Sequence, residues 1–202
     1  MSEEPIPQSS MPNIFELDTL VIADTHGRFD EEALKEQLKT PPPAVFLLGD
    51  IEYPDLKRII ELCTGLPIYG VLGNHDDKTF FDDLPQVEHL NGRMVTFHGI
   101  RIAGLSGSVK YKESPNRCMI TQEEGKRLLM DVPDCDILIT HDKPCFGVPQ
   151  DYDAHGGLVG IAEYIKNHSP KFVLHGHMHE PGITKYKDTY IRCCYNIERI
   201  VL

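Results

Sequence analysis

Five short polar clusters, rich in aspartate and histidine, stand in order along this chain. They are Asp24-Thr25-His26, Gly49-Asp50, Gly73-Asn74-His75-Asp76, Thr140-His141-Asp142 and Gly176-His177-Met178-His179. Carboxylate oxygens and imidazole nitrogens in one site suit divalent ions such as Mn²⁺, Fe²⁺ and Zn²⁺. Two such ions roughly 3.5–4 Å apart polarise a phosphoryl oxygen and lower the pKa of a bridging water. The residue types therefore predict a site for two divalent metal ions.

Seven side chains in these clusters are candidate metal ligands. They are Asp24, His26, Asp50, Asn74, His141, His177 and His179. Asp24 and His26 stand two residues apart and could hold one ion, whereas His177 and His179 could each face a different ion. Asp50 could bridge the two ions, because a carboxylate has two oxygens. The set supplies ligands for two divalent metals, with Mn²⁺ favoured and Fe²⁺, Zn²⁺, Ni²⁺ or Co²⁺ also compatible.

Each cluster follows an apolar, β-branched run that predicts a strand. The five runs cover residues 18–24, 44–48, 67–72, 135–140 and 171–174. Amphipathic spacing predicts helices at residues 30–39, 54–63, 121–130 and 158–167. Because ligands in such sheets collect at the carboxyl ends of parallel strands, we expect the clusters to meet at one edge.

The middle and the end of the chain predict shorter strands. Residues 87–90, 93–98 and 100–105 are separated by Asn91-Gly92 and His98-Gly99, which indicate hairpin turns. Residues 106–120 are expected to form a polar loop, and the final strands cover 182–186, 189–193 and 199–202. We expect a polar N-terminal tail over residues 1–16 and a single domain over 17–202. Two mixed sheets packed face to face, with helices outside, satisfy this order.

Composition narrows the class of partner. The net charge of −11 disfavours extended nucleic acid and anionic membranes. No stretch approaches the roughly 20 apolar residues of a membrane span, and no secretory signal opens the chain. We therefore expect a cytoplasmic protein whose six cysteines are reduced and mainly structural. The roles of the adjacent Cys193 and Cys194 stay open.

The ordered motifs D-x-H, G-D, G-N-H-D, H and G-H-x-H resemble those of the calcineurin-like metallophosphoesterase superfamily. They span residues 24–179. The resemblance implies an α/β (α+β) fold, a four-layer αββα sandwich of two mixed β-sheets flanked by helices. It implies that the first metal is held by Asp24, His26, Asp50 and His179. It implies that the second metal is held by Asp50, Asn74, His141 and His177.

Two further residues take catalytic roles by the same resemblance. His75 matches the family's catalytic histidine, which contacts the phosphoryl group and protonates the leaving oxygen. Asp76 takes the acidic position after it and could orient the His75 ring. The implied reaction is attack on phosphorus by metal-bound hydroxide, with His75 as general acid.

Several alternatives remain at this stage. We favour phosphodiester bonds of small substrates, with phosphomonoesters as the nearest alternative. A catalytically silent scaffold, as in the retromer subunit of this superfamily, is a third possibility, although no ligand position is missing here. Arg28 and His155 are candidate substrate-binding residues, and a basic group of Lys110, Lys112 and Arg117 could line the mouth of the cleft. Edge strands near the C-terminus leave a homo-oligomer open.

Overall fold

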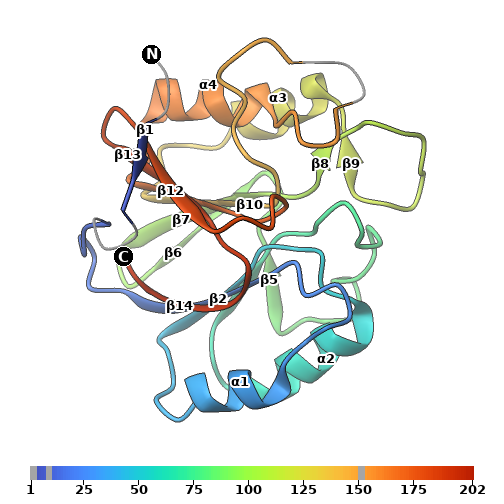
Figure 1. The fold of residues 1–202 in the computed structure, drawn as a ribbon, viewed down its shortest axis with the longest axis vertical. Helices are drawn as coiled ribbons and strands as arrows, with labels where there is room; N and C mark the ends of the chain where they lie inside the picture. The colour runs from blue at the N-terminus through green and yellow to red at the C-terminus, as the bar shows by residue number, and fades with distance from the viewer. Residues whose placement is uncertain (1–3, 8–10, 150–152) are drawn as a thin grey trace.

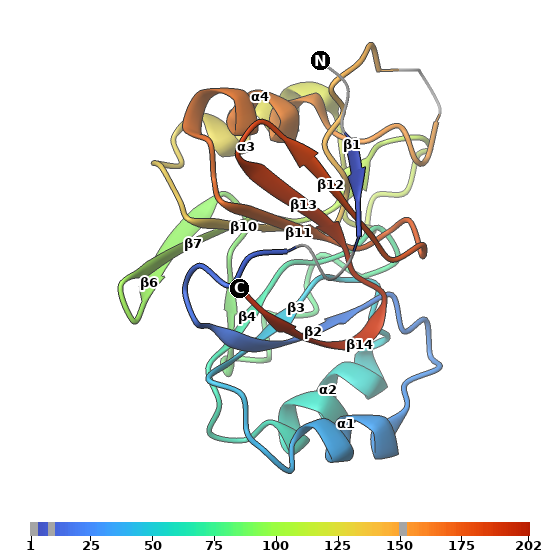
Figure 2. The same cartoon turned by 60° about the vertical axis from the view of Figure 1, so that its left-hand side comes forward.

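The computed structural model describes residues 4–7, 11–149 and 153–202. Two large β-sheets pack face to face, and one pair of helices covers the outer face of each sheet (Figure 1). The layers run helix, sheet, sheet, helix, which confirms the expected αββα sandwich (Figure 2). Among these residues, no helix is both long and apolar enough to cross a membrane.

The five-stranded sheet carries the first three polar clusters. Its strands are β2 (Asp18–Ala23), β3 (Ala44–Leu47), β4 (Ile68–Gly70), β5 (Val87–His89) and β14 (Asn196–Val201). Their order across the sheet is β14-β2-β3-β4-β5, in which β2 to β5 are parallel and β14 is antiparallel to β2. Helices α1 (Glu31–Gln37) and α2 (Tyr53–Leu62) return the chain between β2, β3 and β4, as parallel pairing requires.

The seven-stranded sheet carries the other two clusters. Its strands are β1 (Glu4–Ile6), β6 (Arg93–Phe97), β7 (Ile100–Leu105), β10 (Ile137–Thr140), β11 (Phe172–His175), β12 (Gly182–Tyr186) and β13 (Thr189–Cys193). The order is β1-β12-β13-β11-β10-β7-β6, with a parallel centre and antiparallel edges. Helices α3 (Gln122–Met130) and α4 (Val159–His168) pack on its outer face.

Alternation along the strands divides the apolar side chains among three cores. In β2, Val21 and Ala23 face the core between the two sheets, whereas Leu20 and Ile22 face α1 and α2. This division follows from the two-residue period of a strand. Strands buried on both faces explain the continuous apolar runs in the sequence.

Capping side chains define where two helices begin. The Asp30 carboxylate accepts a hydrogen bond of 2.9 Å from the amide of Ala33. Thr121 and Glu124 form a capping box at the start of α3. Both devices satisfy amides that have no partner within the helix. All four expected helices are present, with ends within two residues of their expected positions.

One expected hairpin is absent. β6 and β7 do form a hairpin through His98 and Gly99, whose φ values of 48° and 83° suit a tight turn. Asn91 and Gly92 do not close a hairpin, because β5 belongs to the five-stranded sheet and β6 to the seven-stranded sheet. This segment instead carries the chain from one sheet to the other.

Two expected irregular segments contain strands. Within the supposed loop at 106–120, β8 (Ser108–Val109) and β9 (Met119–Ile120) pair in parallel. Within the supposed tail at 1–16, β1 pairs antiparallel with β12, and Met11 and Phe15 pack against the inter-sheet core. β1 pairs backbone groups of β12 that would otherwise lie at the sheet edge, whereas β8 and β9 form a separate two-stranded sheet. The domain boundary at residue 17 stays a prediction.

Gly104 of β7 generates a test of how closely the two sheets approach. An added Cβ would lie 2.7 Å from the Cβ of Leu90 and 2.9 Å from Cγ1 of Val71. We expect Gly104→Ala to lower the free energy of unfolding by about 1–3 kcal/mol through overpacking. Urea denaturation measures this effect, with Gly147→Ala as control because an added Cβ there meets nothing within 4 Å. Equal midpoints for the two variants would contradict the close approach.

Candidate metal centre

The strand ends bring six of the seven candidate ligands into two groups. Asp24, His26 and His179 form one triad, and Asp50, His141 and His177 form another. The seventh candidate, Asn74, contacts His141 of the second triad. In each triad, the potential ligand atoms lie within 4.8 Å of one another. The two triads lie side by side at the carboxyl ends of strands from both sheets. No single stretch of the chain supplies either group.

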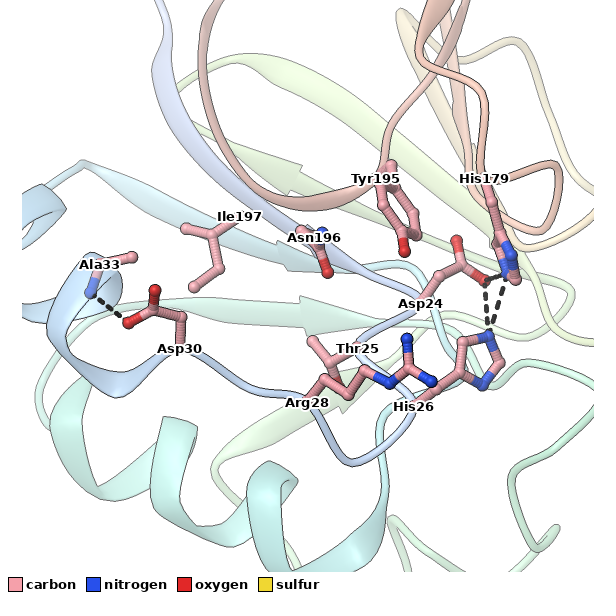
Figure 3. Close-up of a pocket in the computed structure, with 10 residues that line it drawn as sticks. All are labelled: Asp24, Thr25, His26, Arg28, Asp30, Ala33, His179, Tyr195, Asn196 and Ile197. Atoms are coloured by element: carbon pink, nitrogen blue, oxygen red, sulfur yellow. Dashed lines mark hydrogen bonds and ion pairs between the residues drawn. The ribbon is translucent and has the colours of Figure 1, made fainter.

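The first triad contains an unsatisfied acceptor. Nε2 of His26 and Nε2 of His179 lie 3.0 Å apart, and Oδ1 of Asp24 lies 3.4 Å from the latter (Figure 3). This Oδ1 is buried and has no hydrogen-bond partner among the described residues. The other oxygen, Oδ2, accepts a bond of 2.8 Å from the amide of His177 and so holds the carboxylate in place. A buried, unpaired carboxylate oxygen that faces two imidazole nitrogens is a set of ligand atoms that suits a divalent cation.

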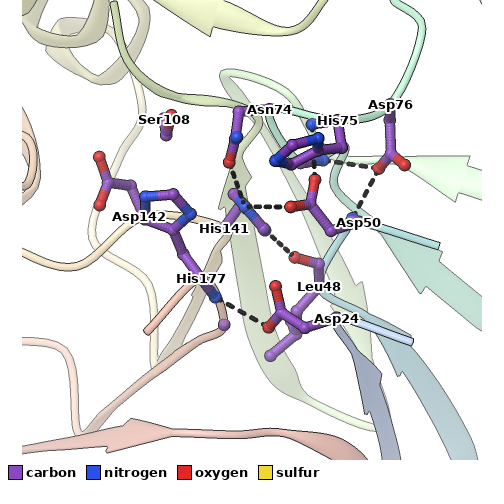
Figure 4. A network of polar contacts seen from close by, with 12 residues as sticks. Asp24, Leu48, Asp50, Asn74, His75, Asp76, Ser108, His141, Asp142 and His177 are labelled. Atoms are coloured by element: carbon purple, nitrogen blue, oxygen red, sulfur yellow. Dashed lines mark hydrogen bonds and ion pairs between the residues drawn. The ribbon is translucent and has the colours of Figure 1, made fainter. Parts of the chain in front are cut away.

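The second triad is almost fully buried. Nε2 of His141 lies 3.5 Å from Oδ2 of Asp50 and 2.9 Å from Oδ1 of Asn74 (Figure 4). Oδ2 of Asp50 also lies 3.8 Å from Nε2 of His26, which belongs to the first triad. The Asp50 carboxylate therefore stands between the two groups, where a bridging ligand would stand.

Backbone carbonyls select the nitrogen that each buried imidazole presents. Nδ1 of His141 lies 2.7 Å from the carbonyl oxygen of Leu48, so this nitrogen donates and Nε2 is left as the ligand atom. Nε2 of His177 lies 2.7 Å from the carbonyl oxygen of Ala154, so Nδ1 is left free. Such outer contacts orient metal-binding histidines in known sites.

Two glycines allow the turns after β3 and β4 to touch. Gly49 has a φ of 88°, and an added Cβ would lie 2.2 Å from the amide nitrogen of Gly73. A Cβ on Gly73 would lie 2.1 Å from Oδ1 of Asp50. The glycines that precede Asp50 and Asn74 are therefore required by the close approach of two backbones.

Left-handed backbone is concentrated at the site. Five of the seven candidate ligands have positive φ: Asp24 (54°), His26 (46°), Asp50 (54°), His177 (68°) and His179 (55°). Such conformations cost roughly 1–3 kcal/mol each and cluster at functional sites. The surrounding strands impose this geometry, and it turns the ligand atoms inward.

His75 and Asp76 are adjacent in sequence but lie in different surroundings. The His75 side chain is exposed, its ring centroid lies 5.3 Å from that of His26, and its amide donates to Oδ1 of Asp50 at 2.7 Å. The Asp76 carboxylate is buried and accepts bonds from the amides of Asp50, Ile51 and Gly73. The described residues show no hydrogen bond between Asp76 and the His75 ring, and a role of Asp76 in orienting that ring stays a prediction. Asp76 clamps the two turns that carry Asp50 and Asn74.

The two candidate substrate-binding residues lie on opposite flanks. Arg28 lines a cavity together with His26 and His179. His155 is exposed, and its ring centroid lies 4.9 Å from that of His177. Their binding roles stay predictions.

The basic residues at 110–117 do not act together in this structure. Arg117 lines a second cavity with His75 and donates a hydrogen bond to the His75 carbonyl. Lys110 instead pairs with Glu113 at 2.9 Å. Of these cations, the structure places only Arg117 in the lining of that cavity.

Sequence reasoning missed two residues near the centre. Asp142 is fully buried beside His141 and accepts hydrogen bonds from the amides of Val109 and Lys143. Its place next to a ligand was a usable signal. Tyr195 lies between β13 and β14, where the chain passes from one sheet to the other, and its ring centroid lies 5.3 Å from that of His179. Nothing in the local sequence marked Tyr195.

A family model described as the calcineurin-like phosphoesterase superfamily domain matches residues 17–193. The chain belongs to this superfamily. Calcineurin-like phosphoesterases bind dinuclear metals, and the two triads are the potential metal-binding groups of this member.

One protein is similar to this chain in sequence, and two solved structures are similar to it in fold. An uncharacterized protein of Haemophilus influenzae is 28% identical over 207 residues, which cover 85% of this chain and 87% of that protein. TT1561 of Thermus thermophilus matches the fold with a TM-score of 0.65 at 17% identity, with 89% of each chain covered. Phosphopantetheinyl hydrolase of Mycobacterium tuberculosis matches with a TM-score of 0.60 at 12% identity, covering 93% of this chain and 97% of that one. These two structures show a shared calcineurin-like phosphoesterase fold.

The position of Asp50 generates a prediction about metal stoichiometry. We expect Asp50→Asn to weaken both metal sites, whereas His179→Asn should weaken only the site built on Asp24 and His26. Asparagine retains the acceptor for the His75 amide, so the fold should survive the first change. Metal content after dialysis, measured by mass spectrometry, tests the difference. Full metal content in Asp50→Asn would contradict a bridging position.

A second prediction concerns protons. Burial disfavours the charged form of His141, but the negative charge of Asp50 outweighs it and raises the pKa of His141 to about 10. Burial, with the charge of His141, lowers the pKa of His177 to about 3, so that imidazole is already neutral. Below pH 10, a metal must therefore displace the His141 proton, and affinity should fall about tenfold per pH unit on acidification.

Calorimetry in buffers of different ionisation enthalpy measures this release. At pH 8 we expect about one proton per metal bound at the His141 site. A binding enthalpy independent of the buffer would contradict it.

Proposed function

We propose that this calcineurin-like phosphoesterase hydrolyses phosphodiester bonds of small substrates at a dinuclear metal centre. The observation that carries the proposal is that two cavities with different linings meet at His26. A phosphodiester has two organic arms, and each cavity offers room for one of them. A phosphomonoester has one arm and would leave one cavity without an occupant.

The two cavities differ in character. The larger, of about 740 Å³, extends from the first triad past Arg28 and Tyr195 toward β14. The smaller, of about 350 Å³, contains His75 and Arg117 and is walled by Tyr53 and Phe80. The rings of Tyr53 and Phe80 have centroids 5.2 Å apart, and they offer an apolar surface to a leaving group.

The residues then take distinct roles. Asp50 would be shared by the two metals, and the other candidate ligands would complete the sites with mixed oxygen and nitrogen donors that suit Mn²⁺. When bound, the metals would polarise the phosphoryl oxygens and activate the attacking water. His75 stands in the smaller cavity, where its imidazole can donate a proton to the leaving oxygen. The leaving arm therefore occupies the cavity of His75, and the retained arm occupies the cavity of Arg28.

Two further observations favour a small phosphate ester as substrate and a cytoplasmic location. The Mycobacterium tuberculosis neighbour is a hydrolase named for a phosphate-bearing group, which by analogy of fold favours a small phosphate ester. All six cysteines are free thiols, and five are buried, which favours a reducing compartment such as the cytoplasm.

Turnover of matched aryl esters tests the proposal. With added Mn²⁺, we expect kcat/KM for bis(p-nitrophenyl) phosphate to exceed that for p-nitrophenyl phosphate. Chelation by EDTA should abolish turnover, and Mn²⁺ should restore it. Rapid monoester cleavage without diester cleavage would favour the phosphatase alternative. A protein that binds no divalent metal would instead fit the scaffold alternative.

The same assay tests His75. We expect His75→Ala to lower kcat by roughly 10²–10⁴-fold through loss of general acid catalysis. The loss should be greater for a phenyl than for a p-nitrophenyl leaving group, because the poorer leaving group needs protonation more. His168→Ala, at the C-terminal end of α4, is the matched control. Equal losses for both leaving groups would contradict proton donation by His75.

A further inference from the structure

Arg28 lies beside the candidate metal centre, and among the described residues its guanidinium has no ion-pair partner. Five of the eight arginines form ion pairs with carboxylates: Arg58, Arg93, Arg101, Arg192 and Arg199. The Arg28 guanidinium contacts no carboxylate in the described chain, although the protein carries a net charge of −11. Arg127 on α3 also forms no ion pair with the described residues, so the distinguishing feature of Arg28 is that its unpaired guanidinium lies in the cavity of the first triad.

The carboxylate closest in sequence is engaged elsewhere. Asp30 lines the same cavity, but its carboxylate accepts the amide of Ala33 and caps α1. Figure 3 shows the Arg28 side chain running alongside His26, whereas Asp30 points away toward the helix. Arg28 thus presents its donors to the cavity.

The charge of the loaded site adds to this argument. The ligand set contains two carboxylates, from Asp24 and Asp50, which do not balance two divalent cations. Adding the Arg28 guanidinium at the edge of that site increases the local excess of positive charge. A single diester group carries one negative charge, so further negative charge on the substrate would be attracted to this cavity.

We propose that the substrate is a phosphodiester whose retained arm carries a second phosphate group, bound by Arg28 in the larger cavity. This inference rests on the proposed function, which places the leaving arm beside His75. A guanidinium fork matches two phosphate oxygens, so it binds such a group more specifically than an ammonium does. Tyr195 and Asn196 line the same cavity and offer a ring face and an amide to the organic part of the arm (Figure 3).

Two matched nucleotides test the second phosphate. They are thymidine 5′-(p-nitrophenyl phosphate) and its 3′-phosphorylated derivative. In both, water adds to the 5′ phosphorus, the bond to p-nitrophenolate breaks, and the retained thymidine phosphate is released. We expect the native protein with Mn²⁺ to prefer the 3′-phosphorylated substrate by about 10–100-fold in kcat/KM, the range of a charged hydrogen-bonded pair.

Variants of Arg28 separate the second phosphate from the reaction itself. Arg28→Gln should bring the ratio of the two kcat/KM values close to one, and Arg28→Lys should leave an intermediate ratio. Arg127→Gln on α3 makes the same change in net charge and should retain the native ratio. A native ratio near one, or an unchanged ratio in Arg28→Gln, would overturn the inference.

Product binding gives a readout that does not depend on turnover. Calorimetry measures the binding of thymidine 3′,5′-bisphosphate and of thymidine 5′-monophosphate. We expect the native protein to bind the bisphosphate more tightly than the monophosphate, and more tightly than Arg28→Gln binds the bisphosphate. If neither nitrophenyl ester is cleaved although Mn²⁺ binds, the proposed function fails, and this binding comparison still decides the role of Arg28. Equal affinities of the native protein for both products would overturn that role.

Discussion

The buried carboxylate of Asp50 is the contact on which the rest of the site depends. One oxygen accepts the amide of His75 at 2.7 Å, and the other faces imidazole nitrogens of both triads. Burial alone would raise the pKa of Asp50, but the charge of His141 outweighs it and lowers the pKa. The carboxylate therefore stays ionised inside the protein, where it can serve two cations and hold the turn that carries His75.

The position of the Asp50 carboxylate depends on unusual backbone conformations in the turns around it. Asp76 accepts the amides of Asp50 and Gly73, and Gly49 lets the two turns come into contact. Left-handed φ values at most of the candidate ligands add strain that the turns alone would not maintain. The double-sided burial of the central strands supplies the rigid frame that keeps these turns in place. The geometry of the site thus depends on the packing of the two sheets, because the candidate ligands lie where the strands end.

Local signals were sufficient for much of this structure. Continuous apolar runs predicted the strands before Asp24, Asp50 and His141, because strands covered on both faces have no polar side. Signals failed where distant segments decide the outcome. Asn91-Gly92 has turn chemistry, but the two flanking strands belong to different sheets. β1 lies in a polar segment and forms because β12 has an unpaired edge.

Residue types and their order therefore determined the ligand chemistry, the helices and the layer architecture. The ligand types can be read directly from the sequence, and hydrophobic periodicity shows which segments form helices and which form buried strands. Only the tertiary structure decided how these groups are used. It placed the Asp76 carboxylate against three backbone amides, set Tyr195 beside His179, and gave the Arg28 guanidinium no carboxylate partner among the described residues. Each of these outcomes depends on packing between segments far apart in the chain, and no local pattern encodes a distance across two sheets.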